Sequence, residues 1–401
     1  MKKLILISSL LIWLVLLIPV QPASSQTNLD PIRTIEIGKN REFIVNGKPF
    51  FPIMSWAQPK STYGILKGVG VNTYCGNADP VAAKEAGGYA VAGFRASGVV
   101  ENGHVLGWIY SDEPDLSTGR GADAKPRQMP DRVAERCAEI RAAKPGRLIF
   151  ITLTSSFMKE SSSYPEEFRK KMYPEYAKSA DVLGYDHYPI YGWGTPGHLD
   201  WVGSGVKQLC ALAGNKPVYA WIESSKGSKW MPLAKQPDVL PIHTRNEVWQ
   251  SIINGATAIG YFTHAWQPDT ITFAPTPDMQ KELSRMNAQI TRLAPAILAD
   301  QPKAKIGMSL ENGMKCQFKA TELEGSIYIF AQNMDLGPGA ENAKQYDPIT
   351  PRAGKATFTV EGLKAKTKIE VVDENRTIIA EKGNFTDDFS PLIEHIYKFK
   401  N

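Results

Sequence analysis

Two apolar runs in this sequence end on carboxylic acids. Residues 107–113 read GWIYSDE and bring Asp112 and Glu113 in front of a proline, and residues 217–223 read PVYAWIE and end on Glu223. The first pair alone has a plain explanation, because proline ends a strand and acidic residues suit a chain that reaches the surface. Glu223 needs another explanation, since an unpaired carboxylate inside an apolar strand is costly.

Two carboxyl groups that face one another across a cleft can hydrolyse a glycosidic bond. One protonated carboxyl gives its proton to the leaving oxygen, and the other carboxylate attacks or stabilises the oxocarbenium-like centre. Partial burial and mutual repulsion would keep one group protonated near neutral pH while the other stays ionised. Glu113 and Glu223 are therefore the predicted catalytic residues.

Eight short segments, rich in β-branched and aromatic residues, predict strands that are buried on both faces. They cover residues 51–56, 71–76, 88–95, 107–113, 148–156, 181–189, 217–225 and 258–266. Helical patterns lie between most of them, as at 130–146, 164–180 and 244–257. This alternation predicts an α/β fold, a (β/α)8 TIM barrel over residues 32–301. Residues 96–104 are too short and glycine-rich for the third helix, so we expect an irregular barrel there.

The pattern changes after the segment QPKAK at 301–305. Short alternating strands follow, joined by Gly, Asn and Asp turns, and no pronounced helical pattern separates them. This is typical of a small antiparallel sheet structure. Residues 302–401 are therefore predicted to form a C-terminal β-sandwich domain.

The strand ends supply the candidate site residues, because catalytic groups of TIM barrels stand at the C-terminal ends of the strands. Glu113 would end the fourth strand and Glu223 the seventh. Aromatic rings near them suit a sugar, whose apolar C–H faces pack against such rings. The predicted substrate-binding residues are Trp56, Asn72, Tyr74, Arg95, Asp112, Asp186, His187, Tyr188, Trp193, His264 and Trp266.

Several of these motifs together resemble the clan A retaining glycoside hydrolases, a superfamily of TIM-barrel glycosidases. They are FIVNGKPFFPI at residues 43–53, the Glu before Pro that ends the fourth strand, the Glu in YAWIESS, and Trp266 closing the eighth. The resemblance covers residues from about 40 to 300, and no family within the clan is assigned.

The resemblance implies a role for each matching residue and an oligo- or polysaccharide substrate. Glu113 would be the general acid/base and Glu223 the nucleophile of a double displacement. Asp186 or Tyr188 would touch or orient the nucleophile, and Trp266 would form the floor of a sugar subsite. Many members place Asn directly before the acid/base, whereas this chain has Asp112. Its negative charge should raise the pKa of Glu113 if both are buried.

The first residues predict export. Residues 1–25 combine a basic start, an apolar run and small polar residues, the pattern of a signal peptide cut near 23–25. A secreted or periplasmic protein is then expected. The alternative is an uncleaved membrane anchor, since the apolar run at 4–20 is nearly long enough to span a bilayer.

Composition argues against other classes of function. The net charge is only +5 over 401 residues and the basic residues are scattered, so nucleic acid is not an expected partner. Four cysteines without a CxxC motif and six histidines without metal spacing predict buried thiols and neither metal nor cofactor. Two rivals remain: a non-catalytic carbohydrate-binding barrel with misplaced or salt-bridged carboxylates, and a metal-dependent hydrolase, which needs converging His and Asp ligands.

Overall fold

The computed structural model describes residues 28–94 and 103–400. Eight parallel strands close into a barrel, in which each strand pairs with its neighbour in the chain and the last pairs with the first. They are β4 (Ile53–Trp56), β5 (Thr73–Gly76), β6 (Tyr89–Gly93), β7 (Val105–Asp112), β8 (Leu148–Thr154), β9 (Val182–Asp186), β10 (Val218–Glu223) and β11 (Ala258–Phe262). The predicted TIM barrel is confirmed.

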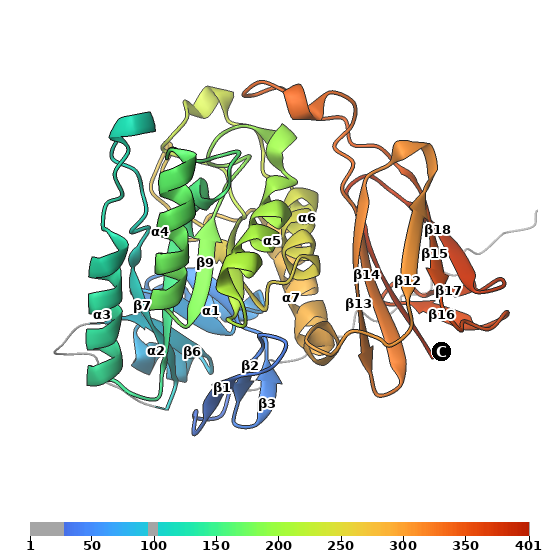
Figure 1. The fold of residues 1–401 in the computed structure, drawn as a ribbon, viewed down its shortest axis with the longest axis horizontal. Helices are drawn as coiled ribbons and strands as arrows, with labels where there is room; N and C mark the ends of the chain where they lie inside the picture. Colours follow the sequence, from blue (N-terminus) through green and yellow to red (C-terminus); the bar gives the residue numbers. More distant parts are fainter. Residues whose placement is uncertain (1–27, 95–102, 401) are drawn as a thin grey trace, which may run out of the picture.

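Helices surround the barrel unevenly (Figure 1). They are α1 (Tyr63–Gly68), α2 (Pro80–Glu85), α3 (Pro130–Ala143), α4 (Glu166–Ser179), α5 (Trp201–Ala213), α6 (Pro241–Ile253) and α7 (Pro277–Ile297). The first two are only six residues long, and the described residues between β6 and β7 form no helix. Most of the segment 96–104, which we expected to be irregular, lies outside the described residues.

Large aromatic side chains fill the barrel interior beside glycines. Tyr219 and Trp221 of β10 point inward with the other interior residues. A Cβ atom on Gly184 would lie 2.0 Å from the Tyr219 ring, and one on Gly260 would lie 2.1 Å from the Trp221 ring. Since protein interiors are close-packed, these rings fit only because the neighbouring strands lack side chains there.

A small antiparallel sheet covers the N-terminal end of the barrel. It consists of β1 (Ile35–Ile37), β2 (Phe43–Val45) and β3 (Lys48–Phe50), and Figure 1 shows it below the barrel strands. Asn46 and Gly47 both have positive φ angles, 52° and 77°, as a tight two-residue hairpin turn requires. Phe43 stacks on Phe150 inside the barrel at 6.0 Å. The end formed by the C-terminal ends of the strands therefore stays open as the mouth.

The C-terminal region forms two antiparallel sheets, which confirms the predicted sandwich. One contains β12 (Ile306–Leu310), β15 (Gly354–Val360) and β18 (Asn384–Phe389). The other contains β13 (Cys316–Leu323), β14 (Ser326–Asn333), β19 (Glu394–Lys400), β16 (Lys368–Val371) and β17 (Arg376–Ile379). Phe358, Phe385 and Tyr397 pack between the sheets. The predicted boundary at 302 falls between α7 and β12.

Buried contacts dock the sandwich on helices α6 and α7 of the barrel (Figure 1). Trp249 of α6 stacks on Phe330 at 5.9 Å between ring centroids. Asn246 Nδ2 donates a hydrogen bond to Leu392 O at 3.0 Å, and Gln332 Nε2 donates to Asn246 O at 3.0 Å. These buried polar contacts fix the orientation of the two parts.

The remaining predictions about the whole chain concern its cysteines and its first residues. Cys75, Cys137 and Cys210 are buried, Cys316 is half-buried, and all four are free thiols. In the part of the chain that the structure describes, no helix is both long enough and apolar enough to cross a membrane. The predicted signal peptide, residues 1–25, lies outside that part.

Candidate active site

A cluster of three carboxylic acids lies at the barrel mouth. Asp112 is the last residue of β7, Glu113 follows it, and Asp186 is the last residue of β9. The Glu113 and Asp186 carboxyl groups are hydrogen-bonded to each other. The Glu113 side chain is 21% exposed, so the pair is partly accessible from the mouth.

An irregularity in β7 directs these side chains. Ile109 pairs with Phe150, but Asp112 pairs with Thr152, so β7 carries one extra residue at this point. Such bulges turn a strand and redirect its side chains. Glu113 itself has a φ angle of 43°, which a non-glycine residue rarely adopts. Strained backbone of this kind persists only where surrounding contacts hold it, often at functional sites.

The electrostatics of the cluster keep a proton on it. Burial, then the charges of Asp112 and Asp115, raises the pKa of Glu113 to about 7. Burial, followed by the charge of Glu113, raises the pKa of Asp186 well above its ordinary value. Arg127 opposes this only weakly, with Nη2 4.0 Å from Glu113 Oε2. Two carboxyls in such contact share one proton near neutral pH. Their hydrogen bond raises the pKa of Asp186 and lowers that of Glu113, so in the free protein the proton lies mainly on Asp186.

Asp115, which the sequence analysis did not single out, anchors the chain after β7. It is fully buried, and its Oδ1 accepts from Thr154 N at 2.9 Å. Its Oδ2 accepts from Thr154 Oγ1 and Tyr173 Oη, both at 2.7 Å. Burial raises the pKa of Asp115 to about 6. These bonds tie the segment that follows Glu113 to the end of β8. The signal for Asp115 was a third acid directly after the proline, in the sequence DEPD at 112–115.

Glu223 lies in a different environment from Glu113. It is fully buried, with Oε1 accepting from Ile190 N at 3.0 Å and Oε2 from Tyr191 N at 2.6 Å. Its carboxyl is also hydrogen-bonded to that of Glu247 on α6, which is equally buried. Burial raises the pKa of Glu223 to about 7 and the pKa of Glu247 well above its ordinary value.

The structure therefore pairs Glu113 with Asp186, and Glu223 with Glu247, where the sequence predicted Glu113 facing Glu223. Glu247 was missed in the sequence analysis. The sequence around it gives no signal of burial, because NEVWQSII at 246–253 mixes polar and apolar residues, whereas the structure buries every one of them on the helix. A carboxylate there needs a partner, because an isolated buried charge is costly.

Four of the predicted binding residues surround the mouth. Tyr188 packs on Phe262 at 5.1 Å, and its pKa is raised well above the ordinary value by burial and then by Asp186. His264 and Trp266 stack at 5.5 Å with nearly parallel rings, just beyond the end of β11. Trp56, at the end of β4, lies 5.2 Å from Trp221. Together these rings form an aromatic border around the carboxyl cluster.

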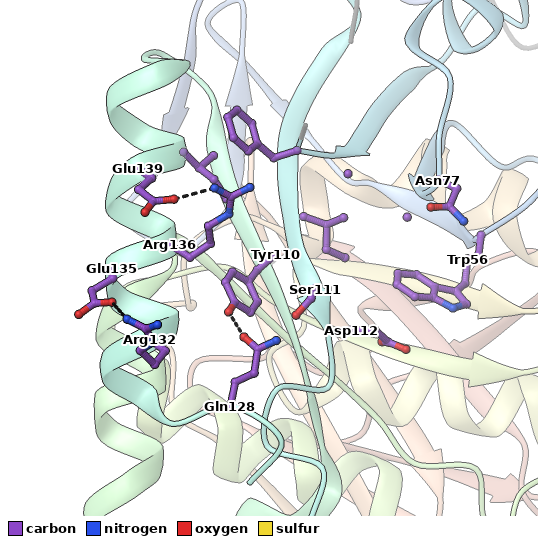
Figure 2. Close-up of a pocket in the computed structure, with 16 residues that line it drawn as sticks. Trp56, Asn77, Tyr110, Ser111, Asp112, Gln128, Arg132, Glu135, Arg136 and Glu139 are labelled. Carbon is purple, nitrogen blue, oxygen red and sulfur yellow. Dashed lines mark hydrogen bonds and ion pairs between the residues drawn. The ribbon is translucent and has the colours of Figure 1, made fainter. Parts of the chain in front are cut away.

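A cavity of about 700 Å³ opens beside Asp112, between the ends of β4 to β7 and helix α3. In Figure 2 the Asp112 carboxylate points toward Trp56, with Asn77 above the indole. On the opposite wall, Arg132 and Arg136 lie on α3 and pair with glutamates of the same helix. The cavity thus combines an aromatic ring with hydrogen-bonding groups, the composition expected of a small-molecule site.

Two predicted binding residues do not reach the mouth. Asn72 precedes β5, where its Oδ1 accepts from Ile53 N at 2.8 Å, so it lies at the N-terminal end of the strands. Tyr74 is buried and stacks on Tyr63 at 3.8 Å, toward α1. The structure does not bring either residue to the mouth, because a position in a strand segment fixes neither the end of the strand nor the face.

The other three predicted residues do not belong to the aromatic border. His187 is buried against Trp201 of α5, at 5.8 Å between ring centroids, and burial lowers its pKa to about 3. Trp193 lies exposed on the loop after β9. Arg95 lies outside the described residues. Among residues 28–94 and 103–400, no group of three or more His, Cys, Asp or Glu is placed to hold a metal ion.

Comparisons with known proteins give similarity of fold only. No protein-family model and no curated protein matches this sequence. An α-amylase from Geobacillus thermoleovorans, solved with acarbose, is 10% identical, with 85% of this chain and 91% of that chain covered and a TM-score of 0.49. A family 30 subfamily 8 xylanase from Clostridium acetobutylicum is 11% identical, with 88% and 96% covered and a TM-score of 0.45. A family 30 endoxylanase from Clostridium papyrosolvens is 12% identical, with 92% and 99% covered and a TM-score of 0.41.

Proposed function

We propose that the protein is a retaining glycoside hydrolase that acts on an oligo- or polysaccharide, with Glu113 as the general acid/base. The observation that carries this proposal is the hydrogen-bonded carboxyl pair of Glu113 and Asp186 at the barrel mouth. A pKa of about 7 lets Glu113 take up a proton near neutral pH. Because the attacking Asp186 has to be ionised, the proposal requires that the shared proton moves from Asp186 to Glu113 when substrate binds. The aromatic residues around the pair suit the C–H faces of a sugar ring.

The attacking carboxylate is the point on which the sequence prediction and the geometry differ. The sequence favours Glu223, which has no exposed surface and whose two oxygens accept backbone hydrogen bonds. The geometry favours Asp186, which contacts Glu113 directly. Glu223 takes the role only if it leaves Ile190 and Tyr191 when substrate binds. We therefore assign the attack to Asp186.

The contact between Glu113 and Asp186 also bears on stereochemistry. Inverting enzymes keep their carboxyl groups roughly 6.5–9.5 Å apart to leave room for a water molecule. Retaining enzymes keep theirs about 5–5.5 Å apart. Hydrogen-bonded carboxyls are closer than either spacing, so the pair is nearer to the retaining arrangement, and a substrate would have to enter between the two groups. Asp186 would bond to the anomeric carbon as Glu113 protonates the leaving oxygen. Glu113 would then take a proton from the water that releases the sugar.

A non-catalytic carbohydrate-binding barrel is the second candidate. The observation in its favour is the burial of Glu223, one of the two carboxylates expected in the cleft. In this case the aromatic border would bind sugars while Glu113 and Asp186 would only stabilise the strand ends.

Hydrolysis of a panel of aryl glycosides and polysaccharides by wild type and Glu113→Gln separates the two candidates. An enzyme should cleave at least one substrate and lose that activity in the variant. Binding of sugars by both proteins without cleavage of any substrate would instead establish the binding barrel.

We also propose that residues 1–25 are a signal peptide and that the mature protein is secreted or periplasmic. The basic, apolar and small-residue order of this segment supports it. Expression of the full chain followed by N-terminal sequencing of the exported protein tests this. A mature terminus near residues 24–26 is expected, and an intact segment in the membrane fraction would contradict it.

A further inference from the structure

Two half-exposed indoles stand on the loops beside the mouth. Among the described residues, Trp193 (52% exposed) and Trp230 (48%) are the only exposed aromatic side chains of large size. Trp193 follows β9, and Trp230 follows β10. A single exposed apolar side chain is ordinary, but exposed apolar surface that is continuous with a cleft is typical of a binding site. We call these two side chains the aromatic rim.

The aromatic rim is continuous with the mouth. Trp230 packs edge-on against Tyr191 at 5.9 Å, and Tyr191 packs on Phe262 at 5.5 Å. Lys229 Nζ lies 5.5 Å from the ring centre of Trp230 and 4.6 Å from that of Trp266. A saccharide chain that leaves the carboxyl pair past Trp266 would therefore meet Trp230 next.

The loop that carries Trp230 is held rigidly by a buried glutamine. Gln236 Oε1 accepts from Gly227 N and Ser228 N, each at 3.0 Å. Its Nε2 donates to Ser228 O at 2.7 Å and to Met231 O at 2.9 Å. All hydrogen-bonding atoms of the side chain are used to fix this loop. A preorganised aromatic group loses little entropy when a ligand binds to it.

The C-terminal domain fixes the other half of the rim. Its segment 337–350 reaches over the barrel, where Figure 1 shows the orange turn at 340–342 beside the loops of the mouth. Gln345 Nε2 donates to Trp193 O at 2.8 Å, and Tyr346 N donates to Gly194 O at 2.6 Å. A Cβ atom on Gly197 would lie 2.4 Å from Ala340 O, so the two backbones touch.

The base of segment 337–350 is equally fixed. Asp335 is buried, and both its oxygens receive hydrogen bonds from Arg352, at 3.1 Å and 2.7 Å. Asp335 Oδ1 also accepts from Gly337 N at 2.9 Å. Bidentate arginine–carboxylate pairs are among the strongest polar contacts in proteins. The segment therefore acts as a rigid arm of the sandwich domain.

Polar atoms between the mouth and the rim lack complete hydrogen bonds. His264 Nδ1, Tyr191 Oη and Trp266 Nε1 are buried without a partner of good geometry, although the last two approach each other and the His264 ring also approaches the backbone of Ala57. Tyr191 and His264 are 2% and 5% exposed. Buried polar groups are normally satisfied. Sugar hydroxyls, which both donate and accept, would complete them only if a bound chain displaces the side chains that cover these atoms.

We propose that the aromatic rim binds the sugar units of a saccharide chain that extends beyond the carboxyl pair, and that segment 337–350 of the C-terminal domain holds Trp193 in position for this. The inference rests on the proposed function for its substrate class. It gives the sandwich domain a part in building the substrate-binding surface.

Chain-length dependence of hydrolysis tests the rim. Trp193→Ala and Trp230→Ala are compared with wild type on an aryl monoglycoside and on oligosaccharides of the same sugar. Each variant should raise KM for the longest substrate roughly five- to tenfold, with a smaller effect on shorter ones and kcat within about twofold. Gln345→Ala should raise that KM about twofold. Ile379→Ala, an exposed apolar residue of β17, is the control. A KM change independent of chain length would overturn the proposal.

Binding without turnover separates failure of the rim from failure of the proposed function. Calorimetry uses Glu113→Gln with and without Trp230→Ala, titrated with xylo-, cello- and maltohexaose. Loss of affinity on removing Trp230 supports the rim even if wild type cleaves no substrate. Absence of cleavage would contradict only the proposed function. Equal affinity of both proteins for every hexaose, or binding by neither protein, overturns the rim.

Discussion

Two carboxyl pairs lie in the same barrel, and they share chemistry but not environment. In both, burial raises the pKa values, and in both the two carboxyls are hydrogen-bonded to each other. The pair of Glu113 and Asp186 lies at the mouth and is partly exposed. The pair of Glu223 and Glu247 has no exposed surface, and Glu223 also accepts hydrogen bonds from Ile190 N and Tyr191 N.

The difference shows that a raised pKa alone does not identify a reacting group. Structural networks of buried acids perturb pKa values as active sites do. Access and free hydrogen-bonding capacity separate the two pairs. We interpret the first as the reacting pair and the second as the anchor of the loop after β9, which carries Tyr188, Tyr191 and Trp193.

Removal of the proposed proton donor, Glu113, should cause the largest loss of catalytic rate. Glu113→Gln cannot protonate the leaving oxygen, so kcat should fall about 1,000-fold for a substrate with a poor leaving group. Steady-state kinetics on the best substrate of the panel measure this. The melting temperature should stay close to that of wild type. A variant that keeps a tenth of the activity would place the proton donor elsewhere.

Substitutions of Asp186 and of Glu223 should have opposite consequences: the first should lower kcat, and the second should lower stability. Asp186→Asn should lose at least about 100-fold in kcat without loss of stability, because its side chain keeps its size and polarity. Glu223→Ala leaves two buried N–H groups without acceptors and should lower the free energy of unfolding by roughly 2–4 kcal/mol. Kinetics and urea denaturation of both variants test the contrast. Equal free energies of unfolding for the two variants would contradict the distinction between a reacting pair and a structural pair.

The charge of Asp112 should set the alkaline limit of activity. Asp112 contributes to the raised pKa of Glu113, whose protonated form is the active one. The rate should therefore fall as pH rises through about 7. Asp112→Asn should move this limb to lower pH, as measured by kcat/KM against pH. Asp123→Asn, an exposed acid of the same loop, is the control. An unmoved limb would separate Asp112 from the proton donor.

The buried pair of Glu223 and Glu247 should make the stability of the protein depend slightly on pH. Glu223 has a pKa of about 7 in the fold against an ordinary value of 4.5, so the folded state binds more protons than the unfolded state between these values. Stability should fall as pH rises through this window. Glu247→Gln removes one acid, so its melting temperature should exceed that of wild type by on the order of 1–3 °C at pH 8 and match it at pH 4. Glu167→Gln, an exposed acid on α4, is the control, and parallel curves for Glu247→Gln and wild type would contradict the expectation.

Most of the fold could be predicted because its strands carry strong local signals. The eight barrel strands are nearly continuous apolar runs, as burial on both faces requires. In the sandwich, β12, β17 and β18 were not identified. In β17 and β12 the half-buried and exposed residues give a weak pattern, and β18 carries two adjacent aspartates. Pairing with β15, which is distant along the chain, stabilises β12 and β18, whereas β17 pairs with β16 in a local hairpin.

The site could be predicted only in part. The rule that catalytic groups stand at the C-terminal ends of the strands locates the residues, but it does not say which way each side chain points. Asp186 and His187 are adjacent, yet the first contacts Glu113 and the second packs on Trp201. Glu223 was expected in the cleft, but its carboxyl contacts Glu247 and the loop after β9. These partners lie 24 and 33 residues away, so no local pattern contains them.

Azide rescue of Asp186→Gly and Glu223→Gly tests the central claim most directly. In a retaining enzyme that lacks its nucleophile, azide attacks an activated aryl glycoside in place of the lost carboxylate. We predict that azide restores activity to Asp186→Gly with a glycosyl azide of inverted anomeric configuration, and leaves Glu223→Gly without such a product. Rescue of Glu223→Gly alone would contradict the account and make the buried pair the reacting one.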